Sequence, residues 1–336
     1  MAERPQIIDG FLARHGWAGA ERRPLADDAS FRHYVRLVGN GGSAMLMDAP
    51  PPQENVRPFV RAARLLRQLG FSAPDVYAAD EEAGLLLLED LGDETYTRVL
   101  ASGGDEAVLY ALATDLLVAL HRRFEKPMAA ALPSYDDERL LNEAALLVDW
   151  YLPAVRGAPT PPALREDYID RWRETFSTAR AVMETFVLRD YHVDNLMLLP
   201  GRDGIAACGL LDFQDAVIGP ATYDLVSLLE DARRDVPADL AARMIARYLD
   251  AFPAIDRDAF LASYAILGAQ RSAKIVGIFT RLDRRDGKPI YLKHIARVWR
   301  WLEGDLGHPA LADLRAWLDR ELPPGTRVTP TAKGAG

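Results

Sequence analysis

The sequence predicts an α+β fold with two lobes, a small mixed α/β N-terminal lobe and a larger, mainly helical C-terminal lobe. Two observations lead to this expectation. Strand patterns separated by turn signals dominate roughly the first 90 residues, whereas apolar residues at helical spacing dominate the rest. A short strand–turn–strand pattern at about residues 186–215 interrupts the helices. We therefore expect an N-terminal lobe at 1–90, a helical lobe at 91–322 that carries this hairpin, and a flexible, Pro- and Gly-rich tail at 323–336.

The N-terminal lobe is expected to contain a short sheet and two helices. Alternating apolar residues from Phe31 to Leu37 predict a strand, and the turn Asn40-Gly41-Gly42 leads into a second strand from Ser43 to Met47. The other elements expected here are helices near 7–12 and 56–66 and strands at 76–77 and 85–88.

The helical lobe is expected to begin with a helix whose apolar stripe runs from Val108 to Leu120. Further helices are predicted at 134–151, 168–183, 222–233, 238–251, 258–282, 288–303 and 309–321. Between them, apolar runs at 186–188, 196–199 and 205–211 predict three short strands, and the turn Pro200 to Gly204 joins the last two.

Three oxygen-bearing side chains lie at the ends of these short strands. Asp190 is in the loop after the first strand, Asn195 begins the second, and Asp212 follows the third. This order is used by protein-kinase-like phosphotransferases, in which the first Asp accepts a proton from the attacking hydroxyl and the other two residues hold metal ions on the nucleotide phosphates. Any one of these residues alone would be an ordinary loop residue. Their combination with the strands favours catalysis and a magnesium site.

The pattern departs from that of protein kinases at two positions. Leu188 stands where a His is usual, and Gln214 stands where a Gly would follow Asp-Phe. We expect Asp190 to keep a pKa near ~4, because a carboxylate beside metal ions stays ionised. Asp224 is expected to cap or brace the helix that follows Asp212.

Composition and charge exclude several other classes of protein. The 336 residues are 49% hydrophobic and 26% charged, which is typical of a globular protein. The net charge of −9 argues against nucleic-acid binding. The sequence also has no apolar run long enough to cross a membrane and no signal-peptide pattern, so we expect a cytoplasmic protein without a membrane or an obligate protein partner. The single cysteine, Cys208, is expected to be buried.

The N-terminal lobe offers a nucleotide site. The turn Asp28 to Ser30 precedes the first strand of the hairpin, and its small residues suit a lid over phosphates even though it lacks a Gly. The expected third strand carries no Lys, so Arg32 or Arg36 is left to bind phosphate oxygens. The backbone after Leu88 is expected to bind the adenine ring. The nucleotide-binding candidates are Ser30, Phe31, Arg32, Arg36, Glu89 and Leu91.

Several segments together resemble the aminoglycoside phosphotransferase and choline kinase superfamily. They are Asp28-Ala29-Ser30-Phe31-Arg32-x-Tyr34-x-Arg36, Leu87-Leu88-Glu89-Asp90-Leu91-Gly92, Asp190-x-x-x-x-Asn195 and Leu211-Asp212-Phe213-Gln214-Asp215. A narrower group, the anomeric N-acetylmuramate and N-acetylglucosamine kinases, is resembled by Arg189-Asp190-Tyr191-His192-Val193-Asp194-Asn195, Met47-Asp48-Ala49-Pro50-Pro51, Ala269-Gln270-Arg271 and Tyr291-Leu292-x-His294-Ile295. In that group the missing lobe lysine and the missing His at 188 are expected.

This resemblance implies a bilobal protein-kinase-like fold and an enzyme that uses ATP and Mg²⁺. It implies transfer of the γ-phosphoryl group to the C1 hydroxyl of N-acetylmuramate or N-acetylglucosamine, giving an α-1-phosphate for peptidoglycan recycling. Asp190 would be the catalytic base, and Asn195 and Asp212 the metal ligands. The sugar-binding candidates are Tyr191, His192, Asp194, Asp215, Gln270 and Arg271. Of these, Arg271 suits the lactyl carboxylate of muramate, and His192 alone would more often be a structural loop residue.

Two alternatives remain open at this point. A kinase for choline, another amine or an aminoglycoside would share the same catalytic residues, but its cationic substrate would favour an acidic or aromatic pocket. A nucleotide-binding pseudokinase that acts as an interaction module is the alternative of another class. The missing lobe lysine keeps it open, whereas intact Asp190, Asn195 and Asp212 argue against it.

Overall fold

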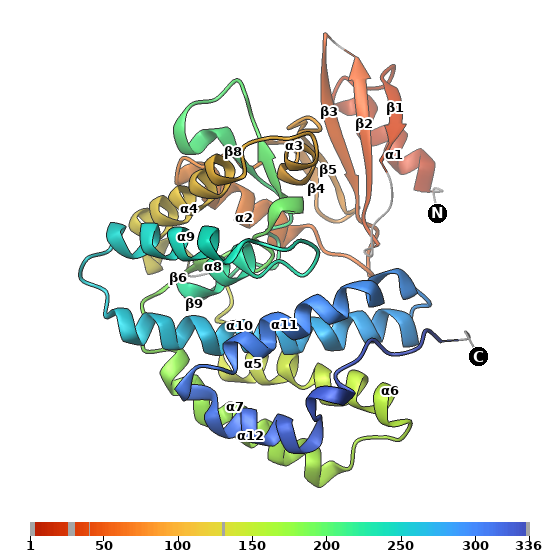
Figure 1. The fold of residues 1–336 in the computed structure, drawn as a ribbon. Coiled ribbons are helices and arrows are strands. Elements are labelled where there is room, and N and C mark those ends of the chain that lie inside the picture. Colours follow the sequence, from red (N-terminus) through yellow and green to blue (C-terminus); the bar gives the residue numbers. More distant parts are fainter. Residues whose placement is uncertain (1–3, 26–30, 40, 130–131, 334–336) are drawn as a thin grey trace. The chain divides into compact units, whose positions relative to one another are not determined.

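The structure is a computed structural model that describes residues 4–25, 31–39, 41–129 and 132–333. The chain divides into two compact units. Unit 1 comprises Met1–Leu116 and Val193–Ala216, and unit 2 comprises Leu117–His192 and Val217–Gly336. Figure 1 shows strands gathered in the first part of unit 1 and long helices in unit 2. The lobe boundaries expected at residues 90 and 322 stay predictions.

Unit 1 is built on a five-stranded antiparallel sheet with the strand order β1-β2-β3-β5-β4. Its strands are β1 Glu21–Pro24, β2 His33–Gly39, β3 Gly42–Asp48, β4 Val76–Asp80 and β5 Leu85–Glu89. The predicted hairpin is confirmed, because β2 pairs with β3 in a register that closes at Gly39 and Gly42. The sequence did not predict β1, whose four polar or turn-forming residues are all exposed.

The other elements of unit 1 include a second, smaller sheet. They are α1 Arg4–Arg14, α2 Arg57–Gln68, α3 Tyr96–Ala101, the start of α4 Glu106–Arg123, the 3₁₀ turns η3 Val193–Asn195 and η4 Gly204–Ala207, and strands β7 Leu196–Leu198 and β8 Cys208–Leu210. The β7 and β8 strands pair as the predicted antiparallel hairpin. Cys208 is fully buried in β8, as expected.

The core of unit 1 explains the order of its elements. Four leucines in succession make β5 buried along Leu85–Leu88, which is the pattern of a strand covered on both faces. One apolar cluster joins α1 to the sheet through Phe11, Leu12, Leu37, Ala44, Leu46, Leu85 and Leu87. On α2, six apolar residues are buried along one side, as its predicted helical spacing requires.

Unit 2 is mainly helical. Its elements are the end of α4, η1 Lys126–Ala129, α5 Asp137–Ala144, the π-helical turn η2 Leu147–Tyr151, α6 Leu152–Arg156, α7 Pro162–Ala179, β6 Glu184–Val187, β9 Val217–Pro220, α8 Thr222–Leu229, α9 Ala238–Ala251, α10 Arg257–Arg284, η5 Pro289–His294, α11 Ile295–Asp305, η6 Pro309–Leu311, α12 Ala312–Glu321 and η7 Pro324–Thr326.

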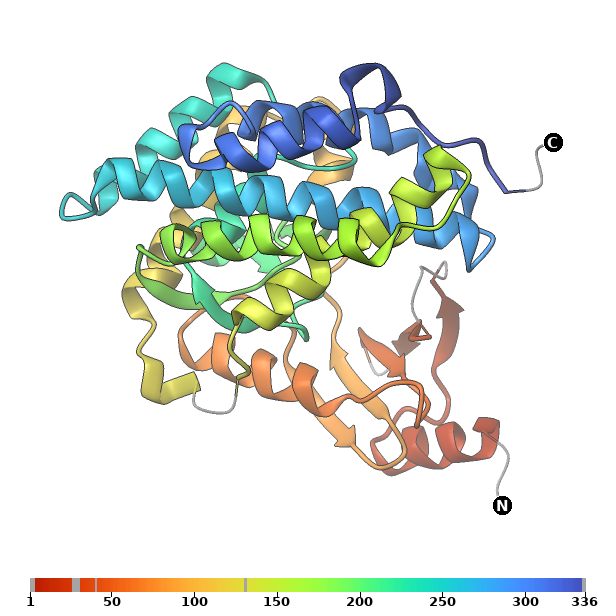
Figure 2. The same ribbon diagram turned by 90° about the horizontal axis from the view of Figure 1, so that it is seen from below.

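The 28-residue helix α10 is the centre of unit 2. It packs against α5, α7, α8 and α11, and Figure 2 shows it running between α7 and α11. Gly268 and Gly277 permit this close packing, because a Cβ atom at Gly277 would lie 2.3 Å from the backbone of Leu146.

One prediction about the short strands was wrong. The three strands expected around residues 186–215 were to form one hairpin, but β6 pairs with β9 in a separate two-stranded sheet. Strand β9 was not predicted, because Val217–Pro220 is short and ends in a Gly and a Pro. The loop that follows β6 therefore begins in unit 2 and ends in unit 1.

The end of the described chain is held by polar contacts within unit 2. The Arg327 side chain is 5% exposed and pairs with Glu303 at 2.9 Å and with Asp319 at 2.6 Å, and the Tyr151 hydroxyl donates to the Val328 carbonyl at 2.8 Å. The flexibility expected of residues 323–336 stays a prediction. Among the described residues, every helix is too short or too polar to span a bilayer.

Candidate active site

Asn195 and Asp212 are brought together in unit 1 by the β7–β8 hairpin. Asn195 ends the 3₁₀ turn before β7, and Asp212 lies two residues beyond the end of β8. The Leu211 amide donates to the Asn195 carbonyl at 2.9 Å, and Asn195 Nδ2 lies 3.5 Å from Asp212 Oδ2. The two predicted metal ligands therefore lie side by side, and the Asp212 side chain is 46% exposed.

The backbone at Asp212 is locally strained. Its φ of +57° lies in the left-handed region, which non-glycine residues rarely adopt. The following residue, Phe213, is fully buried and stacks on Phe59 of α2 with a centroid distance of 4.9 Å. Gln214 donates to Asp212 Oδ1 at 2.7 Å. The buried ring and this hydrogen bond hold the Asp212 carboxylate in place after the strand has ended.

Arg32 links the N-terminal sheet to this pair. Its Nε donates to Glu54 at 3.0 Å, and its Nη1 lies 3.7 Å from Asp212 Oδ1. The side chains of Arg32 and Glu54 are only 16% and 15% exposed. In protein kinases a lysine paired with a helix glutamate supplies the cation beside the metal-binding Asp. Arg32 and Glu54 form a comparable ion pair here, although Glu54 comes just before α2.

Arg36 occupies a different place. It donates to Asp93 at 2.9 Å, to Asp90 at 3.1 Å and to the Gly92 carbonyl at 3.1 Å, so it holds the segment that follows β5. The same segment contains Leu91, whose backbone N–H and C=O form no hydrogen bond within the described residues. Glu89 accepts from Arg202, and its amide donates to the Asp75 carbonyl at 2.8 Å.

The other two nucleotide candidates, Ser30 and Phe31, come just before β2. Ser30 lies outside the described residues, as does the rest of the turn Asp28 to Ser30. Phe31 precedes β2 and is 65% exposed, which is unusual for a phenylalanine within a folded unit.

Hydrogen bonds to a buried side chain fix the backbone just before Asp190 in unit 2. The buried carboxylate of Asp224 accepts the amide of Leu188 at 2.6 Å and that of Arg189 at 2.8 Å. Arg189 has a φ of +73°, so the chain turns sharply just before Asp190. Asp224 thus holds this turn instead of capping α8 as expected, and Ala221 is the N-cap residue of α8. Burial raises the pKa of Asp224 to about 7, against the lowering effect of its two amide donors.

A second buried carboxylate holds the side chain of Arg189. Glu143 on α5 accepts from Arg189 and from the Tyr135 hydroxyl, and it lies 3.2 Å from the ammonium of Lys274 and 3.4 Å from the amide of Gln270. Burial acts to raise the pKa of Glu143, but Lys274 and Arg189 outweigh it and keep the pKa below its usual value. Glu143 therefore stays ionised and joins α5, α10 and the loop of Asp190.

The charge around Asp190 keeps it ionised as well. Burial alone would raise the pKa of Asp190, but Lys274, His192 when it is protonated, and Arg271 outweigh it and lower the pKa below the ordinary value. We expected a pKa near ~4, so the shift is further toward the anion than the sequence indicated. An ionised carboxylate at this position is ready to accept a proton.

The predicted sugar-binding residues divide between the two units. Tyr191, His192, Gln270 and Arg271 are buried in unit 2, whereas Asp194 and Asp215 belong to unit 1. Burial lowers the pKa of His192, so it is neutral near pH 7, and its Nε2 lies 3.4 Å from Arg233. Gln270 donates to the Leu140 carbonyl at 3.0 Å, and Asp194 accepts from Thr97.

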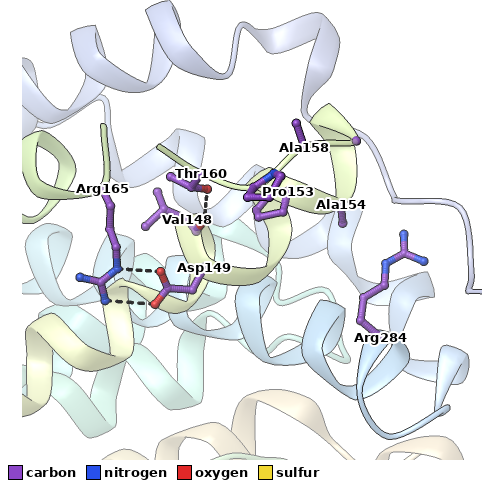
Figure 3. A pocket seen from close by; sticks show the side chains of 10 residues that line it. Val148, Asp149, Pro153, Ala154, Ala158, Thr160, Arg165 and Arg284 are labelled. Atoms are coloured by element: carbon purple, nitrogen blue, oxygen red, sulfur yellow. Dashed lines mark hydrogen bonds and ion pairs between the residues drawn. The ribbon is translucent and has the colours of Figure 1, made fainter. Parts of the chain in front are cut away.

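A surface hollow of about 660 Å³ lies elsewhere in unit 2. Figure 3 shows Asp149 and Arg165 paired at one end of it and Arg284 at the other. Its lining comes from η2, α6, the loop before α7, Arg165 of α7 and Arg284 of α10, and it includes none of the predicted site residues. The polar groups on its rim already have partners, because Arg284 pairs with Asp283 at 3.2 Å and donates to the Thr331 carbonyl at 2.8 Å.

Three residues that matter to this geometry were missed by sequence reasoning. Glu143 and Lys274 lie within predicted helices, where a Glu or a Lys is ordinary, and their pairing across α5 and α10 leaves no local signal. Glu54 was also missed. It lies in a Pro-rich stretch before α2, and only its ion pair with Arg32 singles it out.

Comparisons with known proteins agree with this geometry. Residues 21–261 match the model of the phosphotransferase enzyme family. The chain belongs to this family. It is similar to the N-acetylmuramate/N-acetylglucosamine kinase of Caulobacter vibrioides, with 39% identity over 97% of this chain and 99% of that protein. It is also similar to the kinase of the same name from Pseudomonas aeruginosa, with 40% identity over 93% of each chain.

Solved structures agree on the fold. The GDP complex of wild-type aminoglycoside 2'-phosphotransferase-IIIa matches with a TM-score of 0.61 and 15% identity, over 90% of this chain and 98% of that one. A choline/ethanolamine kinase family protein from Mesorhizobium loti matches with a TM-score of 0.59 and 15% identity, over 95% and 100%. The predicted protein-kinase-like fold is confirmed, as is the resemblance to the aminoglycoside phosphotransferase and choline kinase group.

Proposed function

We propose that this phosphotransferase is an ATP- and Mg²⁺-dependent kinase of amino sugars. It would transfer the γ-phosphoryl group to the C1 hydroxyl of N-acetylmuramate, N-acetylglucosamine or both, and its α-1-phosphate product would enter peptidoglycan recycling. The observation that carries the proposal is the likeness to kinases of that name over nearly the whole chain, at 39% and 40% identity. We also propose a cytoplasmic location, where ATP is available.

In this proposal Asp190 is the catalytic base. The oxygen of the C1 hydroxyl attacks the γ-phosphorus, the bond to the β–γ bridging oxygen breaks, and ADP leaves with that electron pair. The hydroxyl proton passes to the Asp190 carboxylate as the new bond forms. The lowered pKa of Asp190 supports this role because it keeps the acceptor ionised at neutral pH. An anomeric hydroxyl is more acidic than an ordinary alcohol, so a weak base is sufficient.

Asn195 and Asp212 would hold the magnesium ion. The two residues come from adjacent loops, and Asn195 Nδ2 lies 3.5 Å from Asp212 Oδ2. One carboxylate and one amide fit Mg²⁺, which binds few protein ligands and keeps positions for phosphate oxygens and water. When bound, the ion would neutralise charge on the β- and γ-phosphates. The exposed side chain of Asp212 leaves room for this ligand.

We propose a separate role for each nucleotide-binding candidate. We propose Arg32 as the cation that replaces the missing lysine, because it already lies between Glu54 and Asp212. Arg36 would act indirectly, since its contacts with Asp90, Asp93 and Gly92 order the segment that would bind adenine. The backbone of Leu91 offers that ring a donor and an acceptor, and Glu89 lies beside it. Ser30 and Phe31 would cover the phosphates.

The residues proposed for sugar binding have two kinds of role, direct hydrogen bonding to the sugar and support of the site. His192 would offer its neutral ring to sugar hydroxyls, and Tyr191, Asp194 and Asp215 would contribute further hydrogen bonds. Gln270 would support the site through the Leu140 carbonyl and Glu143.

The proposal is tested by measuring ADP release with ATP and Mg²⁺ across several acceptors. N-acetylmuramate, N-acetylglucosamine, choline and kanamycin form the series, and each is measured with wild type and with Asp190→Asn. We expect turnover with the amino sugars only, and a loss of about 10²- to 10⁴-fold in the variant. Turnover restricted to choline or kanamycin would replace the amino-sugar proposal with another kinase. Tight ATP binding without turnover of any acceptor would favour a pseudokinase.

A further inference from the structure

Helix α10 carries two cations whose charges act on Asp190, and the two differ in their ion pairing. Arg271 and Lys274 are three residues apart, so they lie on the same face of the helix. Both interact electrostatically with Asp190. Lys274 is paired with Glu143 at 3.2 Å. The only polar contact of Arg271 within the described part of the chain is a hydrogen bond of 3.2 Å from its Nη1 to the carbonyl of Glu230.

This leaves a buried guanidinium without a carboxylate partner. Arg271 is 5% exposed, and none of the described carboxylates lies within ion-pairing distance of it. A guanidinium has five N–H donors, and one carbonyl satisfies only a part of them. Asp190, Asp224 and Glu230 act on this charge only from beyond ion-pairing distance. A buried guanidinium is usually paired directly with an anion, because burying the charge is otherwise unfavourable. Arg189 illustrates the usual arrangement, because its guanidinium donates to Glu143.

The surroundings of Arg271 place it on the acceptor side of the proposed reaction. Its charge affects the pKa of Asp190, the proposed base, and that of His192, a proposed sugar contact. The Glu230 carbonyl lies at the C-cap of α8 and fixes one corner of the guanidinium. Arg271 keeps 5% of its surface exposed, and we infer that an anion on the acceptor reaches its remaining donors from that side.

We propose that Arg271 binds the carboxylate of the lactyl group of N-acetylmuramate and so determines the preference between that sugar and N-acetylglucosamine. This proposal rests on the proposed amino-sugar kinase function. N-acetylglucosamine has a plain hydroxyl where N-acetylmuramate carries the lactyl ether, so only the second sugar supplies an anion. A planar guanidinium binds a carboxylate through two parallel hydrogen bonds, which a Lys cannot reproduce.

The experiment compares three acceptors in four proteins. The acceptors are N-acetylmuramate, its lactamide, which is neutral but similar in shape, and N-acetylglucosamine. The proteins are wild type, Arg271→Met, Arg271→Lys and the control Arg284→Met. Arg284 lies on the same helix and also donates to a backbone carbonyl, at Thr331. The value measured is kcat/KM, and the ratio of two acceptors within one protein does not depend on how much of the sample is folded.

In the wild type, we expect N-acetylmuramate to exceed its lactamide by about 10- to 100-fold. Arg271→Met should reduce that ratio to near one. Any loss of turnover that follows from removing a charge that acts on Asp190 should be the same for the lactamide and for N-acetylglucosamine. Arg271→Lys should restore a part of the ratio, and Arg284→Met should leave it unchanged.

Two results would overturn the proposal. An equal loss for all three acceptors in Arg271→Met would assign the guanidinium to the transferred phosphoryl group or to the structure of α8. An unchanged ratio would show that the carboxylate is bound elsewhere. Failure of the wild type to use either sugar would instead refute the proposed function, so the two failures are distinguishable.

Discussion

The residues proposed for the metal and the residue proposed as the base are held in opposite ways. In unit 1, Asp212 is 46% exposed and its neighbours are Asn195, Gln214 and Arg32 at distances of 2.7–3.7 Å. In unit 2, the turn before Asp190 is held by two buried carboxylates, Asp224 at the backbone and Glu143 at the side chain of Arg189.

This difference indicates which parts of the chemistry the protein prepares in advance. A base must be aimed before the substrate arrives, so its supports come from the protein's own core. Metal ligands near an incoming nucleotide keep solvent-facing oxygens, since phosphate oxygens and water complete the coordination of Mg²⁺. Substituting the metal ligands in unit 1 should therefore impair ligand binding without loss of stability. Substituting the buried supports of Asp190 in unit 2 should instead lower kcat, with a loss of stability where buried amides lose their acceptor.

The largest difference is expected from Asp212→Asn. The variant should lose about 10²- to 10³-fold in kcat/KM and need more Mg²⁺ for half-maximal rate, because a charged ligand becomes neutral. Its melting temperature without ligand should stay within about 1 °C of wild type, since the carboxylate is half exposed. A Mg²⁺ titration of ADP release and a thermal melt measure both. Asp203→Asn, in the exposed turn before η4, is the control. A large drop in the melting temperature of Asp212→Asn would contradict the proposed difference between the metal ligands and the supports of Asp190.

Asp224→Ala, in contrast, should lower the stability of the protein as well as its activity. It leaves the amides of Leu188 and Arg189 without an acceptor, at roughly 1–3 kcal/mol for each buried group, and releases the turn before Asp190. We expect lower stability in urea together with a lower kcat. Asp256→Ala is a matched control, because Asp256 also accepts two amides, at 3.0 and 3.1 Å, but at the exposed N-terminus of α10. That control should cost about 1 kcal/mol and leave kcat unchanged. Equal behaviour of the two variants would remove the special role of Asp224.

Glu143→Gln should have a moderate effect. The neutral amide still accepts hydrogen bonds, but it no longer balances the charges of Arg189 and Lys274. We expect kcat to fall about tenfold while KM for ATP is unchanged, because the base is misplaced and the nucleotide is not. Glu184→Gln, which removes a partly exposed carboxylate paired with Lys126 at 2.7 Å, should leave kcat as it is. A rise in KM for ATP instead of a fall in kcat would contradict this assignment.

The smallest effect concerns pH. Glu230 and Asp305 form a buried carboxyl pair over Gly268, and burial raises the pKa of both, that of Glu230 to about 7. The folded state therefore binds more protons than the unfolded state between about pH 4.5 and 7, so the free energy of unfolding contributed by this pair falls as pH rises through that range.

Asp305→Asn cannot take part in this titration. Urea denaturation at pH values between about 5 and 8 should show a shallower decline of stability for the variant than for wild type. A steeper decline in the variant would mean that the pair is not protonated in the folded state. The exposed Asp235, paired with Arg297 at 2.8 Å, provides the control substitution Asp235→Asn.

Local patterns predicted the elements of this fold well. The β2–β3 hairpin follows from alternating apolar residues before a glycine turn, and the β7–β8 hairpin from two apolar runs around a turn with Pro and Gly. Helix α9 has the predicted bounds, Ala238–Ala251. Non-local pairing was not predictable in the same way. The partner of β6 is β9, thirty residues later, and nothing in the four residues of β9 identifies them as a strand.

The same distinction between local patterns and non-local contacts applies to the candidate site. Asp190, Asn195 and Asp212 carry a sequence signature because they are spaced along one short stretch of chain. Their supports do not, because Asp224, Glu143 and Glu54 act through contacts with residues distant in sequence. The sequence alone did not distinguish Arg32 from Arg36, because Arg32 comes just before β2 and Arg36 lies on it. The ion pairs of the two side chains distinguish them.

The position of the transferred phosphate gives the most direct test of the central claim. N-acetylglucosamine, ATP and Mg²⁺ are incubated with wild type or with Asp190→Asn, and the products are examined by phosphorus–proton correlation NMR. We expect the wild type to give a sugar phosphate whose phosphorus couples to the anomeric proton, in the α configuration. The variant should give almost none, although it still binds ATP. A phosphate on another hydroxyl, or the same product at an undiminished rate from the variant, would contradict the account.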